Sequence, residues 1–432
     1  MDYQQSRAYV SDADRYAGGA LDLTNIKELM KRLGNPQDQL KYVHVAGTNG
    51  KGSVIAYLYT TLSEAGYRVG RYISPSVYSY REKMDVAGRS VSREQFAGYV
   101  TRVAAAIEEM TSEGLAHPTP FEIETAVAFL FFAEENCDLV ILEVGMGGNL
   151  DATNIIKNTI LAVLVPISMD HQSFLGNTLS EIAEKKAGII KPGCSVVTAG
   201  QQPETMAVIK NVCAQNNTDL TEADLREAKA VKEDFAGQIL EYRGETFELS
   251  LAGSYQTENA ALALEALHVL EKKGYPTTVL QRKKGLKDTR WNGRLTIIHR
   301  DPLFIVDGAH NPAAADMLED SVRKYFKGRK LFFIMGVFRD KDYPYIIRKL
   351  CPYAQQIVTV ETPDNPRALP AGELAEAIKP CNPNVQAAGS IEDAVNKVFD
   401  MAGCDDVILS FGSLSFIGQI TAIVKTREEK NS

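Results

Sequence analysis

The sequence has few of the features that mark secreted, membrane-spanning or zinc-binding proteins. Its six cysteines are scattered over 432 residues and no two have C-x-x-C spacing, which disfavours a disulfide framework or a zinc site. No uninterrupted apolar run approaches the ~20 residues that cross a bilayer. Residues 1–16 are polar and acidic and lack the basic and apolar regions of a signal peptide. We therefore expect a cytoplasmic protein with reduced thiols and no membrane partner.

An excess of positive charge is also missing. The chain carries 47 Lys and Arg against 55 Asp and Glu, a net charge of −8, and it has no long basic run. This balance argues against nucleic acid as a partner but allows a local basic pocket for an acidic substrate. Hydrophobic residues make up 45% of the chain, as in an ordinary globular protein. The length of the chain favours two or three domains.

What the chain does have is an alternation of short apolar runs with helix-length amphipathic stretches. The apolar runs have the length of buried strands and occupy residues 42–46, 138–144 and 159–167. Helical spacing is found at residues 56–67, 94–110 and 123–136. This alternation predicts α/β architecture with a parallel sheet.

The second half of the chain shows a change of pattern and then a return to it. Residues 216–252 contain short β-type runs and Gly turns, which predict an antiparallel insertion, and a helix is expected from Gln256 to Lys273. A charged break at residues 288–296 precedes renewed α/β alternation, typical of a smaller doubly wound domain. We therefore predict two domains, residues 1–293 and 294–432.

The strongest motif is VHVAGTNGKGSV at residues 43–54, between a predicted strand and a predicted helix. Glycines there let backbone N–H groups close around an anion, and the following helix points its positive end at it. Lys51 supplies charge for the β- and γ-phosphates, and Ser53 supplies a hydroxyl for Mg²⁺. The spacing differs from G-x-x-x-x-G-K-[ST], which would require Gly at Val45 and Ser or Thr at Gly52. The loop residues are Gly47, Thr48, Asn49, Gly50, Lys51, Gly52 and Ser53.

Two further strand ends carry polar side chains. Glu143 ends one predicted strand and is followed by a glycine-rich turn, and Asp170 and His171 follow another. The carboxyl ends of parallel strands are where α/β proteins bind ligands, and a carboxylate there can hold a hard cation beside phosphates. We therefore expect a metal role for Glu143 and His171, against the alternative of ordinary strand-end side chains.

Other candidates stay open on the residues alone. Glu122 is either an acid in the first turn of a helix or a substrate contact. Lys185 and Lys186 are either solvated helix lysines or functional groups. In the second domain Asp307 ends a predicted strand, where an Asp commonly meets a ribose hydroxyl. Arg294 lies in the linker and is either a surface residue or a contact to nucleotide.

The motifs together resemble one family. GTNGKGS resembles the nucleotide loop of the Mur-type ligases, and most closely that of the folylpolyglutamate synthase/dihydrofolate synthase branch. Further segments similar to that family occur in its order along the chain: YISPS, EVGMGGNLDATN, MDHQSFLGNTLSEIAEKKAGIIKPG, QTENAALAL, WNGRL, VDGAHNP, MGVFRDKDY, TPDNPRAL and FGSLSFIG.

The resemblance implies a fold and a reaction. The fold would be an N-terminal P-loop ATPase domain of Mur-ligase type with a parallel sheet, followed by a smaller Rossmann-like α/β domain. The reaction would be ATP-dependent amide ligation, in which a folate carboxylate becomes an acyl phosphate and the amine of L-glutamate attacks it. The expected cofactors are ATP and Mg²⁺, the expected partners are folate, L-glutamate and ATP, and we expect a monomer.

The same resemblance implies roles for individual residues. The implied nucleotide contacts are the loop residues 47–53 together with Asn259, Arg294 and Asp307. The implied metal ligands are Ser53, Ser74, Glu143, His171 and Lys186, the last as a carbamate. The implied contacts to the pterin substrate are Glu122, Leu150, Asp151 and Ala152. The implied catalytic residues are Lys51, Lys186 and His171.

The chain departs from the family pattern at four positions. Ser76 stands where S-P-H-L has its His, and Asn149 stands where G-G-R-L-D has its Arg. Lys185 replaces the Glu that often precedes the modified lysine, and Asn25 replaces an early Arg. Because fewer cations would meet an acidic substrate, we predict weaker dihydrofolate synthase than folylpolyglutamate synthase activity.

Three other kinds of protein share part of this pattern. A Mur-type ligase for cell-wall precursors would need a nucleotide-sugar domain, and we expect none within the 46 residues before Gly47. A catalytically inactive nucleotide-binding homologue is disfavoured by the retained Ser53, Glu143, His171 and Lys186. A plain P-loop kinase would lack the VDGAHNP and WNGRL segments.

Overall fold

In the computed structural model, which describes residues 1–16, 22–235, 237–363 and 365–431, the chain forms two compact units. The first comprises Met1–Ser76, Tyr80–Ala228 and Glu258–Asp288. The second comprises Val77–Ser79, Lys229–Thr257 and Thr289–Ser432. The predicted domain boundary at residue 293 lies close to Asp288, where the chain passes from the first unit to the second for the last time. Residues 229–257, which were predicted in the first domain, belong to the second unit. The division into functional domains at residues 293 and 294 stays a prediction.

The first unit is built on an eight-stranded sheet in the order β4-β3-β2-β5-β1-β6-β7-β8. Strands β2, β5, β1, β6, β7 and β8 are parallel, whereas β3 and β4 form an antiparallel edge. The strands are β1 (Tyr42–Ala46), β2 (Val69–Tyr72), β3 (Met84–Val86), β4 (Arg89–Ser90), β5 (Leu139–Glu143), β6 (Thr159–Leu164), β7 (Ser195–Thr198) and β8 (Asp219–Glu222).

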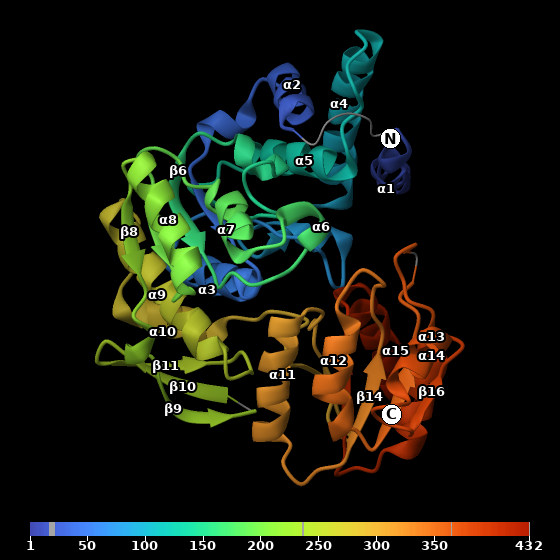
Figure 1. Cartoon of the computed structure of the whole chain (residues 1–432). Helices are drawn as coiled ribbons and strands as arrows, with labels where there is room; N and C mark the ends of the chain where they lie inside the picture. The colour runs from blue at the N-terminus through green and yellow to red at the C-terminus, as the bar shows by residue number, and fades with distance from the viewer. Residues whose placement is uncertain (17–21, 236, 364, 432) are drawn as a thin grey trace. The chain divides into compact units, whose positions relative to one another are not determined.

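Helices α3 to α8 lie between strands of this sheet along the chain, whereas α1 and α2 precede β1 and α9 and α10 follow β8 (Figure 1). Helix α5 contacts both α1 and α4. The helices are α1 (Tyr3–Asp12), α2 (Thr24–Arg32), α3 (Lys51–Glu64), α4 (Arg93–Ser112), α5 (Pro120–Glu134), α6 (Gln172–Leu175), α7 (Leu179–Ala187), α8 (Pro203–Gln215), α9 (Gln256–Lys272) and α10 (Val279–Asp288). Helix α9 begins in the residues of the second unit.

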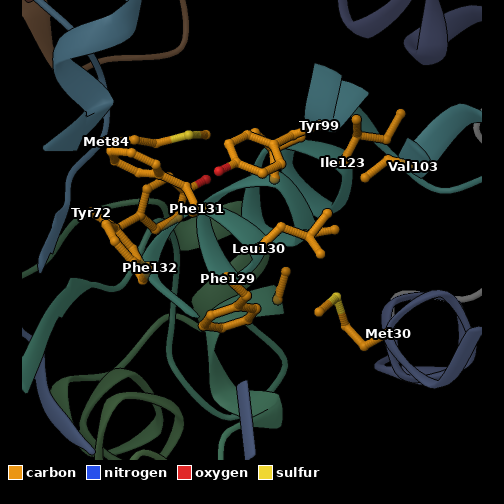
Figure 2. Packing of buried hydrophobic residues seen from close by; sticks show 14 of the residues in the cluster. Met30, Tyr72, Met84, Tyr99, Val103, Ile123, Phe129, Leu130, Phe131 and Phe132 are labelled. Atoms are coloured by element: carbon orange, nitrogen blue, oxygen red, sulfur yellow. The ribbon is translucent and has the colours of Figure 1, made fainter. Parts of the chain in front are cut away.

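Helix α5 is the centre of a hydrophobic cluster. Thr119 caps it, Pro120 occupies its first turn, and every residue from Glu122 to Phe132 is buried. A helix that is apolar on all sides is buried in a core. Figure 2 shows the consecutive side chains of Phe129 to Phe132 directed to different sides of α5. This packing holds the N-terminus of α5, and with it Glu122, in a fixed place.

The central strands bring three connecting loops together. β1 lies between β5 and β6, with Val45 opposite Glu143 in β5 and opposite Val163 in β6. The three strands are parallel, so their carboxyl ends meet at one edge of the sheet. The loop after β1, the turn after Glu143 and the segment after β6 therefore start side by side, where ligands bind in α/β proteins.

The second unit contains two sheets. A six-stranded sheet runs β12-β13-β17-β14-β15-β16, with β12 antiparallel to β13 at one edge. Its strands are β12 (Thr296–His299), β13 (Leu303–Val306), β14 (Leu331–Met335), β15 (Gln356–Thr359), β16 (Val385–Ala387) and β17 (Val407–Phe411). The helices are α11 (Pro312–Tyr325), α12 (Tyr343–Leu350), α13 (Ala371–Ile378), α14 (Ile391–Met401) and α15 (Ile417–Asn431).

The other sheet, β11-β10-β9, is antiparallel and packs against the end of α11. It consists of β9 (Lys229–Asp234), β10 (Gly237–Tyr242) and β11 (Glu245–Leu249). The ring of Phe235 lies 5.2 Å from that of Phe326, and the hydroxyl of Tyr325 donates to Glu233 at 2.9 Å. These contacts explain why residues 229–257 belong to the second unit.

The fold class predicted from the sequence is confirmed, with one correction. The strands expected at residues 42–46, 138–144 and 159–167 are β1, β5 and β6. The antiparallel insertion was expected from residue 216, but β8 (Asp219–Glu222) extends the parallel sheet beside β7 instead. Its half-exposed burial pattern is that of an edge strand, which apolar periodicity does not reveal. Among the described residues, no helix is both long and apolar enough to span a membrane.

Candidate active site

The phosphate-type loop lies between β1 and α3. Helix α3 begins at Lys51, and Gly50 before it has a φ of 98°, in the left-handed region that favours glycine. Gly47 has a φ of 141°, and a Cβ there would lie 2.2 Å from Cγ2 of Val165. Glycine is therefore required at both positions by the local geometry. The loop leads directly into the positive end of a helix, as an anion site requires.

Contacts from two other segments hold this loop. The N–H of Thr48 donates to the carbonyl of Pro166 at 2.9 Å, and its hydroxyl donates to the carbonyl of Ser168 at 3.0 Å. A Cβ on Gly50 would lie 2.5 Å from Oδ1 of Asn259. The structure therefore places Asn259, a predicted nucleotide contact, against the loop.

Lys51, Glu143 and Ser74 come together beside the loop. Nζ of Lys51 donates to the carbonyls of Gly47 and Thr48, both at 3.3 Å, and lies 4.0 Å from Oε1 of Glu143. The other carboxylate oxygen of Glu143 accepts the N–H of Ser74 at 3.1 Å. Glu143 is only 7% exposed, so these contacts hold a carboxylate in a low-dielectric place beside the ammonium group of Lys51.

Lys186 reaches the same loop from α7. Its Nζ donates to the carbonyl of Gly47 at 2.9 Å, and the residue is buried. Burial lowers the pKa of Lys186 to about 7, and the nearby charge of Lys51 adds to this effect. Lys185 is half-buried, one helical position away. About half of the Lys186 amine is therefore in its neutral form near neutral pH.

Most of the predicted metal ligands are buried residues beside the loop, and several of them offer oxygen atoms. His171 is more exposed to solvent than Ser53, Glu143 and Lys186. His171 has a φ of 50°, and its N–H donates to Oδ1 of Asp170 at 2.8 Å. Its Nε2 lies 3.9 Å from Oδ2 of Asp170. Ser53 is buried in the first turn of α3. Within the described part of the chain, no three His, Cys, Asp or Glu side chains form a group that could hold a metal.

The glycine-rich turn after β5 packs on the end of α7. The N–H of Asn149 donates to the carbonyl of Lys185 at 2.9 Å, and Nδ2 of Asn154 donates to the carbonyl of Gly188 at 3.1 Å. A Cβ on Gly148 would lie 2.7 Å from the carbonyl oxygen of Lys185. The close approach needs glycine at residue 148, and it ties the turn to the segment that carries Lys186.

The predicted pterin contacts differ in exposure. Leu150 is 51% exposed, whereas Asp151 and Ala152 are buried. Glu122 forms a capping box with Thr119, because its carboxylate accepts the N–H of Thr119 at 2.8 Å and the hydroxyl at 2.9 Å. The helix-terminal role of Glu122 is therefore observed, and its substrate role stays a prediction.

In the second unit, Arg294 and Asp307 lie close together. Asp307 follows β13 and accepts the N–H groups of Leu295 at 2.9 Å and Ala309 at 2.8 Å. A Cβ on Gly308 would lie 2.3 Å from Nη1 of Arg294. Burial raises the pKa of Asp307, and the charge of Arg294 opposes that shift. The two predicted nucleotide contacts of this unit thus form one local group.

Comparison with known proteins now adds the family. The Mur ligase middle domain matches residues 45–267, and the Mur ligase glutamate ligase domain matches residues 293–414. A dihydrofolate synthase/folylpolyglutamate synthase of Bacillus subtilis is 34% identical, over 98% of this chain and 99% of its own. The chain belongs to the folylpolyglutamate synthase/dihydrofolate synthase family of Mur ligases. It is a folate–glutamate ligase, an enzyme that forms a carbon–nitrogen bond.

Solved structures of this family have the same fold. Mycobacterium tuberculosis folylpolyglutamate synthase complexed with ADP and AMPPCP has a TM-score of 0.87 and 30% identity, covering 98% of this chain and 99% of that one. E. coli FolC in complex with DHPP and ADP has a TM-score of 0.85 and 27% identity, covering 99% and 98%. The likeness spans both units of this ligase.

Sequence reasoning missed one buried polar group at the site. His44 lies in the middle of β1 and is fully buried, and its Nε2 lies 2.8 Å from Oγ1 of Thr153. A titratable residue inside an otherwise apolar strand, three positions before Gly47, was the available signal. Burial lowers the pKa of His44 to about 3, and Lys191 adds a smaller effect, so its ring is neutral near neutral pH.

Proposed function

We propose that this ligase binds ATP with residues 47–53 and uses it to activate a folate carboxylate for attack by L-glutamate. The observation that carries the proposal is the convergence of Lys51 and Lys186 on the carbonyl of Gly47, with Glu143 4.0 Å from Lys51. The charge of Lys51 at a helix N-terminus, with acidic groups beside it to hold a cation, suits a transferring phosphoryl group. Complexes of relatives with ADP and AMPPCP support the same assignment.

The donor groups in this place fit a hard divalent cation. Glu143 offers a buried carboxylate, Ser53 and Ser74 offer hydroxyls, and His171 offers an imidazole beside Asp170. Oxygen ligands are what Mg²⁺ prefers. We propose these residues as the magnesium ligands, together with Lys186 as a carbamate, whose formation requires the neutral amine that burial favours. Bound Mg²⁺ would offset repulsion between the phosphates and the attacking carboxylate.

The reaction then follows from the chemistry of the two substrates. A folate carboxylate oxygen attacks the γ-phosphorus of ATP, the bond to the β-phosphate oxygen breaks, and ADP leaves with that electron pair. The amine of glutamate next attacks the carbonyl carbon of the acyl phosphate, inorganic phosphate leaves and the amine loses a proton. Lys51 is placed to stabilise the charge that develops on the transferring group. The positive end of α3 faces the same charge.

We further propose roles for the remaining residues. Asn259, which lies beside Gly50, is proposed as a nucleotide contact, and so are Arg294 and Asp307. Leu150, Asp151, Ala152 and Glu122 line the pterin part of the folate. The proposed partners are folate, L-glutamate and ATP, for a monomeric cytoplasmic enzyme. DHPP and ADP are the ligands of E. coli FolC in its complex, which supports this substrate class.

One assay separates this function from its alternatives. Purified enzyme is given ATP, L-glutamate and one acceptor, either tetrahydrofolate, dihydropteroate or a muramyl nucleotide precursor. We expect ADP release only with the folate acceptors and only when glutamate is present. Turnover with the muramyl precursor would assign a cell-wall ligase, and no turnover with any acceptor would assign a nucleotide-binding homologue without catalysis.

A further inference from the structure

A chain of buried hydrogen bonds links the phosphate-loop strand to the proposed folate loop. His44 in β1 contacts Oγ1 of Thr153 through Nε2 at 2.8 Å. Oγ1 of Thr153 contacts Oδ1 of Asp151 at 2.5 Å. Asp151 also accepts the N–H of Thr153 at 3.0 Å through Oδ1, and that of Met146 at 2.9 Å through Oδ2. All four residues are in the first unit.

Each hydrogen bond in this chain has a defined donor and acceptor. Two backbone N–H groups point at the carboxylate of Asp151, so it acts as an acceptor. The hydroxyl of Thr153 therefore donates to Asp151, and its oxygen is left to accept the Nε2–H of His44. Among the described residues, Nδ1 of His44 is buried without a hydrogen-bond partner. This fits a neutral ring that carries its proton on Nε2.

The chain of bonds gives a second anchor to the glycine turn, which the hydrogen bond from Asn149 to Lys185 already holds against α7. Asp151 caps the 3₁₀ turn η4 (Ala152–Ile155) and holds the N–H of Met146 at the other end of the glycine turn. Leu150, between these points, is exposed. His44 in turn lies in a strand paired on both sides, with Leu142 and Ala162. The glycine turn is thus hydrogen-bonded, through Thr153 and His44, to a strand that its neighbours hold on both sides.

We propose that His44 is a positioning residue for the folate: acting through Thr153, it sets Asp151 and the turn at residues 145–151 relative to the loop at residues 47–53. The folate carboxylate must meet the γ-phosphate within bonding distance, so the two loops need a fixed separation. The hydrogen bond from His44, in the strand that leads into the loop at residues 47–53, to Thr153, at the base of the turn at residues 145–151, fixes this separation. This proposal rests on the proposed pterin contacts at Leu150, Asp151 and Ala152.

The test compares variants that remove the bond with variants that keep it. Thr153→Val has nearly the same shape but no hydroxyl, and Thr153→Ser keeps the hydroxyl. His44→Leu removes the donor, and His44→Gln keeps an N–H near the Nε2 position. Thr421→Val is the matched control, because Thr421 is buried in α15 and its hydroxyl donates to Ile417 in the same helix at 2.8 Å.

The readouts are the KM values for tetrahydrofolate, ATP and glutamate, with kcat and thermal unfolding. Loss of a hydrogen bond in a chain ending on a carboxylate is worth ~1.5–3 kcal/mol, so we expect Thr153→Val and His44→Leu to raise the KM for folate by about tenfold or more. The KM for ATP should change by less than about twofold in the same variants, since such a change is below ~0.5 kcal/mol. The Ser, Gln and control variants should remain close to wild type.

Other outcomes overturn the proposal. Equal rises in the KM for folate and ATP, unchanged KM values, or a Val variant that behaves like the Ser variant would each show that the bond does not position folate. If both bond-removing variants fail to fold while both bond-keeping variants fold, the bond is structural only. Wild-type enzyme that ligates neither folate acceptor would instead refute the proposed function, before any variant is compared.

Discussion

At the scale of single residues, the two adjacent lysines of α7 offer a direct contrast. The amine of Lys186 is buried and bonded to the carbonyl of Gly47, whereas Lys185 is half-buried about one-third of a turn away. We expect Lys186→Ala to lower turnover by ~10²-fold or more, because it removes the proposed carbamate ligand of the Mg²⁺ that would stabilise transition-state charge. Added acetate should restore part of it by replacing the carbamate. Lys185→Ala is the control and should stay active, and the reverse pattern would move the role to Lys185.

His44 makes a prediction about pH and stability. Its pKa is about 3 in the folded chain against an ordinary 6.5, so the unfolded chain binds more protons between these values. The contribution of neutral His44 to the free energy of unfolding is therefore fully present above about pH 6.5, and it is lost as the pH falls towards about pH 3. His44→Gln lacks this titration, so the wild type should lose ~1.4 kcal/mol more than the variant per pH unit in that window. Urea unfolding at several pH values measures this, and parallel pH profiles would contradict it.

At the scale of elements, the contact between the glycine turn and α7 depends on a missing side chain. A Cβ on Gly148 would lie 2.7 Å from the carbonyl oxygen of Lys185 and 2.9 Å from that of Lys186. We expect Gly148→Ala to destabilise the fold by ~1–3 kcal/mol through overpacking and to lower activity by moving the turn. Unfolding by denaturant and ADP release measure the two effects.

A glycine in an open place is the control for Gly148. Gly98 lies inside α4, and a Cβ there would meet nothing within 4 Å. Gly98→Ala should stabilise the enzyme by ~0.5–1 kcal/mol, because alanine loses less backbone freedom in a helix. Equal effects of the two substitutions would show that the close approach at Gly148 does not matter.

The elements also show how far the sequence alone could reach. Apolar runs predicted the buried strands β1, β5 and β6, because a strand covered on both faces is apolar throughout. The same rule could not find β8, whose residues are partly exposed at the sheet edge. The sequence also predicted the sheet of β9 to β11 as part of the first domain. Its packing on α11 joins residues far apart in the chain, such as Phe235 and Phe326, which no local pattern reveals.

Site residues were predicted where a local motif carries the chemistry. The glycines and Lys51 form such a motif, and the structure shows the left-handed backbone that requires Gly50. The family resemblance supplied Ser74 and Asn259, which have no local signal of their own. His44 was missed because its partner Thr153 is 109 residues away in the chain. The fold brings that partner near because Thr153 follows β5 and precedes β6, the two strands between which β1 lies.

At the scale of the whole molecule, the departures from the family pattern predict a substrate preference. Asn25 and Asn149 stand where the family resemblance leads us to expect arginines, so we predict fewer charge-assisted hydrogen bonds to an acidic substrate. We expect kcat/KM with dihydropteroate to be roughly tenfold below that with tetrahydrofolate. Asn149→Arg should narrow this difference. Equal kcat/KM values for the two acceptors in the wild type would contradict the prediction.

The central claim is that this ligase transfers the γ-phosphoryl group of ATP to a folate carboxylate before glutamate attacks. The most direct measurement uses tetrahydrofolate labelled with a heavy oxygen isotope in the reacting carboxylate and examines the inorganic phosphate by mass spectrometry. Lys51→Ala, which should fold but lose turnover, is the control. The account predicts one labelled oxygen in each phosphate released by the wild type. Phosphate without label, alongside normal formation of the glutamyl product, would contradict it.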